Sequence, residues 1–165
     1  MHVRRTKGAY AMLINSFEHN VDAKGRLFIP AKWREDLGST IIVTRGMLGK
    51  SDRRCLFGMS LAMWNVLLER YNKIAMSDVK AQNALRMTFA NACDCELDKQ
   101  GRILISSTLR KYAGIDKDAV LVGMGNRIEI WSSEMWASQL AASEEEEQEE
   151  EQESDALAHL AGLGI

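Results

Sequence analysis

Two short segments place an aspartate, a glycine and an arginine at the same spacing and could do electrostatic chemistry. They are Asp22-Ala-Lys-Gly-Arg26 and Asp98-Lys-Gln-Gly-Arg102. Glycine in an aspartate-led turn permits a tight hairpin, and an exposed arginine can donate two hydrogen bonds to O6 and N7 of guanine. The same residues could instead form an ion pair that only fixes the turn. The residue types leave both interpretations open.

A DNA-binding turn would divide its work among neighbouring residues. Lys24 would supply a charge that does not read sequence, and Gly25 would let the backbone approach a phosphate. In the second turn Lys99 supplies the charge and Gln100 stands where Lys24 stands in the first. The primary candidates are Arg26, Arg102, Lys24, Gly25, Lys99, Gly101 and Gln100, and the secondary DNA or interface candidates are Arg34, Arg110 and Lys32.

Charge is distributed unevenly along the 165 residues. Residues 1–143 carry all 21 Lys and Arg and a net charge of +7, whereas residues 144–165 carry −9, giving −2 overall. A basic body is typical of a polyanion binder. Residues 144–153 contain only Glu and Gln, which predicts a solvated tail, disordered or loosely helical. A second hypothesis is that this tail competes with DNA for the basic body.

Other chemistries lack the residues they need. Cys93-Asp-Cys95 has no second Cys/His pair near it, because the three histidines are scattered, so we expect no metal and no cofactor. No nucleophile–base set or glycine-rich phosphate loop is present, so we expect no catalytic residue, no enzyme activity and no small-molecule substrate. An arginine four residues after each aspartate would lower the pKa of the carboxyl, which suits a general acid poorly.

Membrane association and secretion are also not expected. The longest uncharged stretch, residues 55–68, has 14 residues, whereas a membrane span needs about 20 apolar residues. No secretory signal pattern is found, and three cysteines without a disulfide pattern indicate a reducing cytoplasm.

The two motifs lie in two copies of one supersecondary unit. Residues 20–38 and 96–114 share six identities at an offset of 76, and a later Ser-x-x-x-Trp occurs in both copies. Each copy predicts strand, turn, strand, short helix, two strands and a terminal helix, with first-copy strands at 17–21, 26–29, 40–44 and 56–59 and a helix at 31–37. Amphipathic spacing predicts helices at 64–75 and 79–92 between the copies. One copy is too small for its own core, so the two should pack together.

These elements divide the chain into five parts. We expect a flexible basic leader at 1–11, a first repeat at 12–60, a helical connector at 61–93, a second repeat at 94–142 and a disordered acidic tail at 143–165.

The arrangement resembles the MraZ family, within the AbrB-like swapped-hairpin superfamily. The resemblance rests on both motifs, on Leu27-Phe-Ile-Pro-Ala-Lys-Trp-Arg34, on Ile103-Leu-Ile with Leu109-Arg110, and on residues 120–131. It covers about residues 12–140 and is specific because the motif occurs twice at this spacing. Ser106-Ser107 departs from the family pattern, which usually places proline after the isoleucine, and the leader and the glutamate-rich tail lie outside it.

The resemblance implies an α+β fold in which two tandem AbrB-like, swapped-hairpin repeats form one pseudo-symmetric barrel with connecting helices. It implies a bacterial transcriptional regulator of the division and cell-wall gene cluster that binds short direct repeats of double-stranded DNA in its own promoter. Such a protein would be a ring-shaped homo-oligomer in the cytoplasm, associated with the nucleoid. The resemblance favours a DNA role for Arg26 and Arg102 and a structural role for Asp22 and Asp98. The alternative is an antitoxin-like or scaffold protein-interaction module with only nonspecific DNA affinity.

Overall fold

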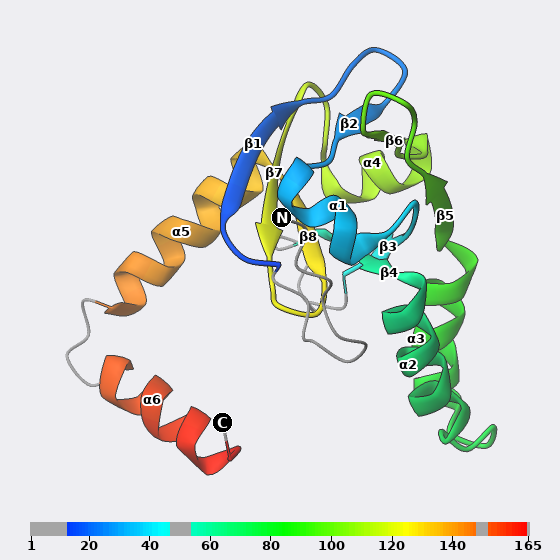
Figure 1. The fold of residues 1–165 in the computed structure, drawn as a ribbon. Helices are drawn as coiled ribbons and strands as arrows, with labels where there is room; N and C mark the ends of the chain where they lie inside the picture. The colour runs from blue at the N-terminus through cyan, green and yellow to red at the C-terminus, as the bar shows by residue number, and fades with distance from the viewer. Residues whose placement is uncertain (1–12, 47–53, 148–151, 165) are drawn as a thin grey trace, which may run out of the picture.

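The computed structural model describes residues 13–46, 54–147 and 152–164, and its elements follow the predicted repeat (Figure 1). The first copy contains β1 Ser16–Asn20, β2 Arg26–Phe28, α1 Ala31–Leu37, β3 Thr40–Arg45, β4 Leu56–Ser60 and α2 Leu61–Asn72. After α3, Val79–Ala90, the second copy contains β5 Cys93–Glu96, β6 Arg102–Leu104, α4 Ser107–Ala113, β7 Asp118–Gly123, β8 Ile128–Ser132 and α5 Ser133–Glu147. A last helix, α6, spans Gln152–Gly162.

Capping residues explain where the helices begin. Pro30 precedes α1, whereas Ser106 precedes α4 and accepts a hydrogen bond from the backbone N–H of Leu109 at 3.3 Å. Ser106, which stands where the first copy has Pro30, therefore starts α4 by side-chain capping. Ser60 and Ser132 cap α2 and α5 in the same way, each accepting at 3.1 Å from the N–H three residues on.

The strands of the two copies interleave. A six-stranded antiparallel sheet has the order β1-β7-β8-β4-β3-β5, and β2 pairs with β6 in a separate two-stranded ribbon (Figure 1). If each strand is exchanged for its counterpart in the other copy, the same strand order results, read from the opposite edge of the sheet. The two copies are therefore related by a pseudo-twofold axis. The cross-copy pairs also share a register, because the end of β1 lies opposite the start of β7 and the end of β5 lies opposite the start of β3.

The predicted closed barrel is wrong, although the α+β class is confirmed. β1 and β5 form the edges of the six-stranded sheet, and in the described residues neither has a ladder partner on its outer side. The three-residue strands β2 and β6 pair with each other, and in the described residues the backbone pairing next to the end of β1 is a single isolated bridge between Val21 and Leu27. The tight turns after β1 and β5 thus divert the chain before the backbone ladder can close.

One hydrophobic core joins the two copies. Its fully buried members include equivalent residues of both copies, namely Leu27, Ile29 and Trp33 with Ile103, Ile105 and Leu109. Because neither copy encloses these side chains alone, the repeats form one folding unit.

The helices α2 and α3 form a pair next to β3 and β4, whereas α5 lies next to β7 and β8, towards the other edge of the sheet (Figure 1). Trp64 and Tyr71 of α2 contact Phe89 of α3 edge to face, with ring centroids 5.7 and 5.8 Å apart. This contact uses the amphipathic stripe predicted for residues 64–75 and packs α2 against α3.

The two ends of the chain are only partly described. Within the predicted tail, residues 143–147 form the end of α5 and residues 152–162 form α6; Glu and Gln are good helix formers, and loosely helical is one of the two forms that the sequence predicts for this segment. The leader at 1–11 lies outside the described residues. In the part of the chain that is described, no helix is both long and apolar enough to span a membrane.

Candidate nucleic-acid interface

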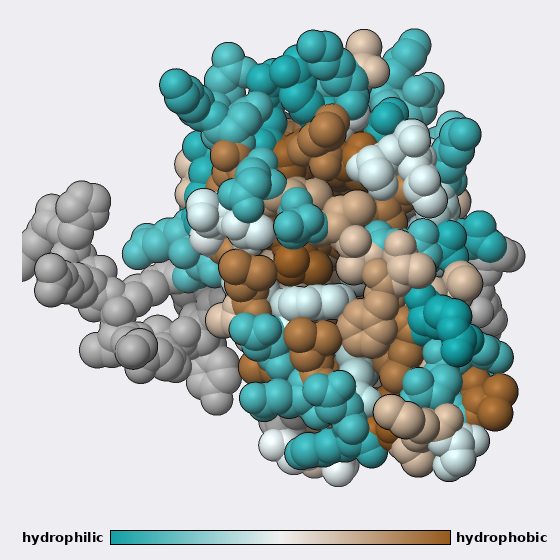
Figure 2. All heavy atoms as spheres, turned by 90° about the vertical axis from the view of Figure 1, so that its right-hand side faces the viewer, coloured by the Kyte–Doolittle hydropathy of each residue, from teal (hydrophilic) through white to brown (hydrophobic). Residues whose placement is uncertain are grey.

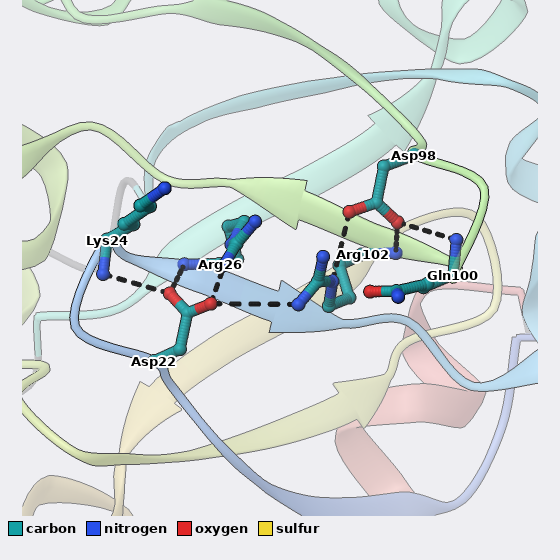
Figure 3. Close-up of polar contacts among 6 residues, drawn as sticks. All are labelled: Asp22, Lys24, Arg26, Asp98, Gln100 and Arg102. Carbon is teal, nitrogen blue, oxygen red and sulfur yellow. Dashed lines mark hydrogen bonds and ion pairs between the residues drawn. The ribbon is translucent and has the colours of Figure 1, made fainter.

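The first turn is organised by the carboxylate of Asp22. Its Oδ1 accepts hydrogen bonds from the backbone N–H groups of Lys24 at 3.0 Å and Arg26 at 2.9 Å. Its Oδ2 accepts from Nε of Arg26 at 2.6 Å, and its carbonyl accepts from the N–H of Gly25 at 2.9 Å. One side chain thus fixes the backbone of the turn and the direction of the arginine (Figure 3).

The second turn has the same construction. Oδ1 of Asp98 accepts from the N–H groups of Gln100 and Arg102, both at 2.9 Å, and Oδ2 accepts from Nε of Arg102 at 3.0 Å. The N–H of Gly101 donates to the carbonyl of Asp98 at 3.0 Å. Two copies of one motif therefore fold into two copies of one turn.

Antiparallel pairing of β2 with β6 places the two turns at opposite ends of the short ribbon and brings Asp22 of the first turn close to Arg102 of the second (Figure 3). Nη1 of Arg102 lies 3.7 Å from Oδ2 of Asp22, so Arg102 faces the carboxylates of both copies. The side chains of Arg26 and Arg102 are 34% and 26% exposed. The ion pairs expected if the motif only fixes the turn are thus present. Both arginine side chains are nevertheless partly exposed, so a polyanion could bind to them.

Hydrogen bonding keeps both aspartates ionised. The backbone N–H of Arg26 contributes most to lowering the pKa of Asp22 to about 2, and the equivalent bond from Arg102 lowers the pKa of Asp98. Carboxylates held in the charged form at neutral pH orient arginines well and do not supply protons.

The secondary candidates Arg34 and Arg110 are partly buried beneath the turns. Nε of Arg34 donates to the carbonyl of Ile29 at 2.9 Å, and Nε of Arg110 donates to the carbonyl of Ile105 at 3.1 Å. The guanidinium of Arg34 also lies 4.7 Å from the ring centre of Phe28. Each arginine therefore donates a hydrogen bond to the backbone segment that joins a ribbon strand to the following helix.

Each of these arginines also covers a glycine of the other copy. A Cβ atom on Gly101 would meet the guanidinium of Arg34, and a Cβ atom on Gly25 would lie 2.6 Å from Nε of Arg110. Both glycines are buried and have positive φ angles, +88° for Gly25 and +79° for Gly101. This packing explains the glycines by a cross-copy contact that the sequence does not reveal. We call the contacts of Arg34 with Gly101 and of Arg110 with Gly25 the cross-copy contacts.

The remaining predicted residues surround the ribbon. Lys24, Lys99 and Gln100 are exposed on the turns, and Lys32 is exposed on α1. Lys24 extends from the first turn in Figure 3, so it is placed to add positive charge beside Arg26.

Two exposed apolar residues of the ribbon were not among the sequence candidates. Phe28 and Leu104 are 37% and 57% exposed and stand two positions after Arg26 and Arg102. The period-two alternation of a strand, applied to the two motifs, would have placed them on the same face as the arginines.

No metal site is visible in the described residues, where no three His, Cys, Asp or Glu side chains are grouped suitably for an ion. Burial raises the pKa of the Cys95 thiol to about 12, so this cysteine stays protonated.

A second surface feature lies away from the ribbon. On the face drawn in Figure 2, hydrophilic atoms crowd the upper end, and hydrophobic atoms are mixed with them below. Between α2 and α3 a groove of about 460 Å³ is lined in part by Tyr71, Met76, Leu85 and Phe89.

Fold and site together define a chain in which two copies of one β-turn-β-helix unit interleave and present paired Asp–Arg turns on one ribbon. The chain belongs to the MraZ family of transcriptional regulators. The model of this family, described as MraZ protein and antitoxin-like, matches residues 12–87 and again residues 88–158, which confirms two repeats.

Curated relatives agree with this assignment. Transcriptional regulator MraZ of Caldicellulosiruptor bescii is 46% identical over 129 residues, covering 78% of this chain and 87% of that protein. The protein of the same name from Limosilactobacillus reuteri is 47% identical over 125 residues, covering 76% and 84%. That of Symbiobacterium thermophilum is 48% identical over 124 residues, covering 75% and 86%.

Proposed function

We propose that this chain regulates transcription by binding double-stranded DNA sequence-specifically through the β2–β6 ribbon. The observation that carries the proposal is the antiparallel pairing that sets Arg26 and Arg102, with their orienting aspartates, on one ribbon. The major groove of B-DNA admits a two-stranded ribbon, and arginine is the commonest reader of guanine there. The name of the relatives, transcriptional regulator, supports the same conclusion.

The residues would divide the work by their position. Arg26 and Arg102 would read guanines, while Lys24, Lys99 and Gln100 would contact phosphates or neighbouring base edges from the exposed turns. Gly25 and Gly101 would serve by letting the turns pack, and Asp22 and Asp98 would orient the arginines. We assign Arg34 and Arg110 to supporting the turns and leave Lys32 as a secondary phosphate contact. This division makes the site a binding surface with no catalytic role.

The finer proposal concerns the target and the assembly. We infer short direct repeats in the promoter of the protein's own gene, within a bacterial division and cell-wall cluster, and action at the nucleoid in the cytoplasm. For the protein itself, we infer that its two tandem repeats belong to the swapped-hairpin class, and the strand pairs between the two copies support this interpretation. A ring-shaped homo-oligomer would place several ribbons on adjacent repeats and gain affinity through effective concentration.

Exposed apolar side chains on the α2–α3 pair support self-association. These are Leu61, Val66, Val79, Met87 and Phe89, with Met76 between the helices. Contiguous exposed apolar patches mark protein interfaces, so the α2–α3 pair is our candidate surface for self-association.

Binding of DNA from upstream of the protein's own gene, compared with scrambled DNA, tests the proposal by fluorescence anisotropy. We expect Arg26→Ala and Arg102→Ala each to weaken specific binding by roughly 5- to 150-fold, the equivalent of one bidentate guanine contact. Arg70→Ala, which removes the same charge from α2, is the matched control and should retain specificity. Circular dichroism establishes that each variant is folded.

Two outcomes would contradict the proposal. Full specific binding by folded Arg26→Ala and Arg102→Ala would restrict these arginines to fixing the turns. Failure of the wild type to distinguish the two DNAs would favour the antitoxin-like, partner-binding alternative, for which the groove between α2 and α3 is a candidate surface.

A further inference from the structure

Beside its arginines, the outer face of the β2–β6 ribbon carries two large apolar side chains. Arg26 lies opposite Leu104, and Phe28 lies opposite Arg102. Residues opposite each other in a ladder, and residues two apart in a strand, point to the same face. The central residues of both strands are fully buried, so these four side chains share the outer face.

The apolar pair is not explained by the fold alone. Leu104 is 57% exposed, and Phe28 keeps 37% of its surface exposed although it contacts the ring of His19 at 5.5 Å and the guanidinium of Arg34 at 4.7 Å. Single exposed apolar residues are common, but these two occupy equivalent positions in both copies. Phosphates attract charge and offer nothing apolar, so a surface built only for the DNA backbone would not favour them.

We propose that Phe28 and Leu104 contact the C5-methyl groups of thymines next to the guanines that Arg26 and Arg102 read. In the major groove the thymine methyl is the one apolar group on a base edge, and phenylalanine is among the side chains that contact it. The inference rests on the proposed DNA-binding function and deepens it, because it adds a second base to the recognised sequence.

The dimensions of the ribbon agree with this assignment. Opposite residues of an antiparallel pair have Cβ atoms about 4.5–5.5 Å apart, whereas successive base pairs rise by about 3.4 Å. Arg26 and Leu104 therefore reach the same or adjacent base pairs, as do Arg102 and Phe28. A DNA target fits this face when thymine and guanine are neighbours.

Replacing thymine by deoxyuridine tests the contact because it removes only the methyl group. The full-length chain is titrated into DNA from upstream of its own gene, prepared with either base, and into scrambled DNA prepared both ways as the baseline. We expect deoxyuridine to weaken specific binding by about fourfold for each methyl contacted. Leu104→Ala and Phe28→Ala should each weaken binding to the thymine DNA and lose part of the sensitivity to deoxyuridine.

The controls separate this inference from the proposed function. Met124→Ala truncates another exposed apolar residue, 43% exposed, in the β7–β8 turn at the opposite end of the sheet, and should behave as the wild type (Figure 1). Specific wild-type binding that is equally tight with deoxyuridine, or full deoxyuridine sensitivity in folded Leu104→Ala and Phe28→Ala, would overturn the methyl contact alone. Absence of specific binding by the wild type would overturn the proposed function and this inference with it.

Discussion

The cross-copy contact between Arg34 and the second turn predicts an additional cost when Gly101 gains a methyl group. Gly101→Ala would place Cβ where the Arg34 guanidinium lies, at a φ of +79°. An alanine in the left-handed region costs about 1–2 kcal/mol in any case. Gly125→Ala isolates that backbone cost, because Gly125 has a φ of +84° and an added Cβ would meet no atom within 4 Å.

Displacement of Arg34 adds a second cost. Its hydrogen bond to the carbonyl of Ile29, 2.9 Å long, joins a charged donor to a partly buried acceptor. Such a bond contributes about 1.5 kcal/mol, the low end of the range for charged groups because Arg34 remains partly exposed. We therefore expect Gly101→Ala to lower the free energy of unfolding by about 2.5–3.5 kcal/mol and Gly125→Ala by about 1–2 kcal/mol.

Urea unfolding of both variants measures the two costs, and a double-mutant cycle assigns the difference. In an Arg34→Ala background the guanidinium is absent, so the excess cost of Gly101→Ala over Gly125→Ala should shrink. The reasoning is refuted if Gly101→Ala is no more destabilising than Gly125→Ala in the wild type. It is refuted equally if the excess cost stays the same after Arg34 has been removed.

Three further predictions concern acid stability, assembly and the tail. The folded-state pKa of Asp22 is about 2, whereas its usual value is 3.8, so ionised Asp22 stabilises the fold above pH 3.8 and this contribution disappears towards pH 2. Between pH 3.8 and pH 2 the Tm of Asp22→Asn should therefore fall less than the Tm of the wild type or of the control Asp116→Asn. If the α2–α3 surface mediates self-association, Met87→Glu should reduce the molar mass measured by light scattering, whereas Met124→Glu should leave it unchanged. Removing residues 144–165 changes the net charge from −2 to +7, so nonspecific DNA should bind more tightly at low salt, with a gain that shrinks as salt rises; equal affinities at low salt would exclude competition by the tail.

Local elements were predictable because local residues specify them. The predicted helix at 31–37 is α1. The helix predicted from residue 79 is α3, and it begins where the carboxylate of Asp78 accepts a hydrogen bond from the N–H of Ala81 at 3.1 Å. The turns of the two motifs were predictable for the same reason, since aspartate and glycine act within five residues of the chain.

Contacts between the copies could not be derived from the sequence. The motif spacing showed that Arg34 and Arg110 repeat, but not that each packs on the glycine of the other copy. Barrel closure was predicted wrongly for a related reason, because the pairing of β2 with β6 rather than with the sheet depends on how the two copies interleave. These contacts are set by tertiary packing, which residue types and the periodicity of apolar residues do not predict.

Duplication within one chain also bears on the kind of DNA site that the ribbon can read. A dimer of identical chains presents two identical turns, so its two-fold symmetry favours palindromic sites. Here the backbone keeps the pseudo-twofold arrangement, while Lys24 is matched by Gln100 and Phe28 by Leu104. Arg102 faces both carboxylates, so the charge distribution is asymmetric as well. A ribbon with two different ends has a direction, and a directional reader suits repeats that all point the same way along the DNA, which supports the direct-repeat target over a palindrome.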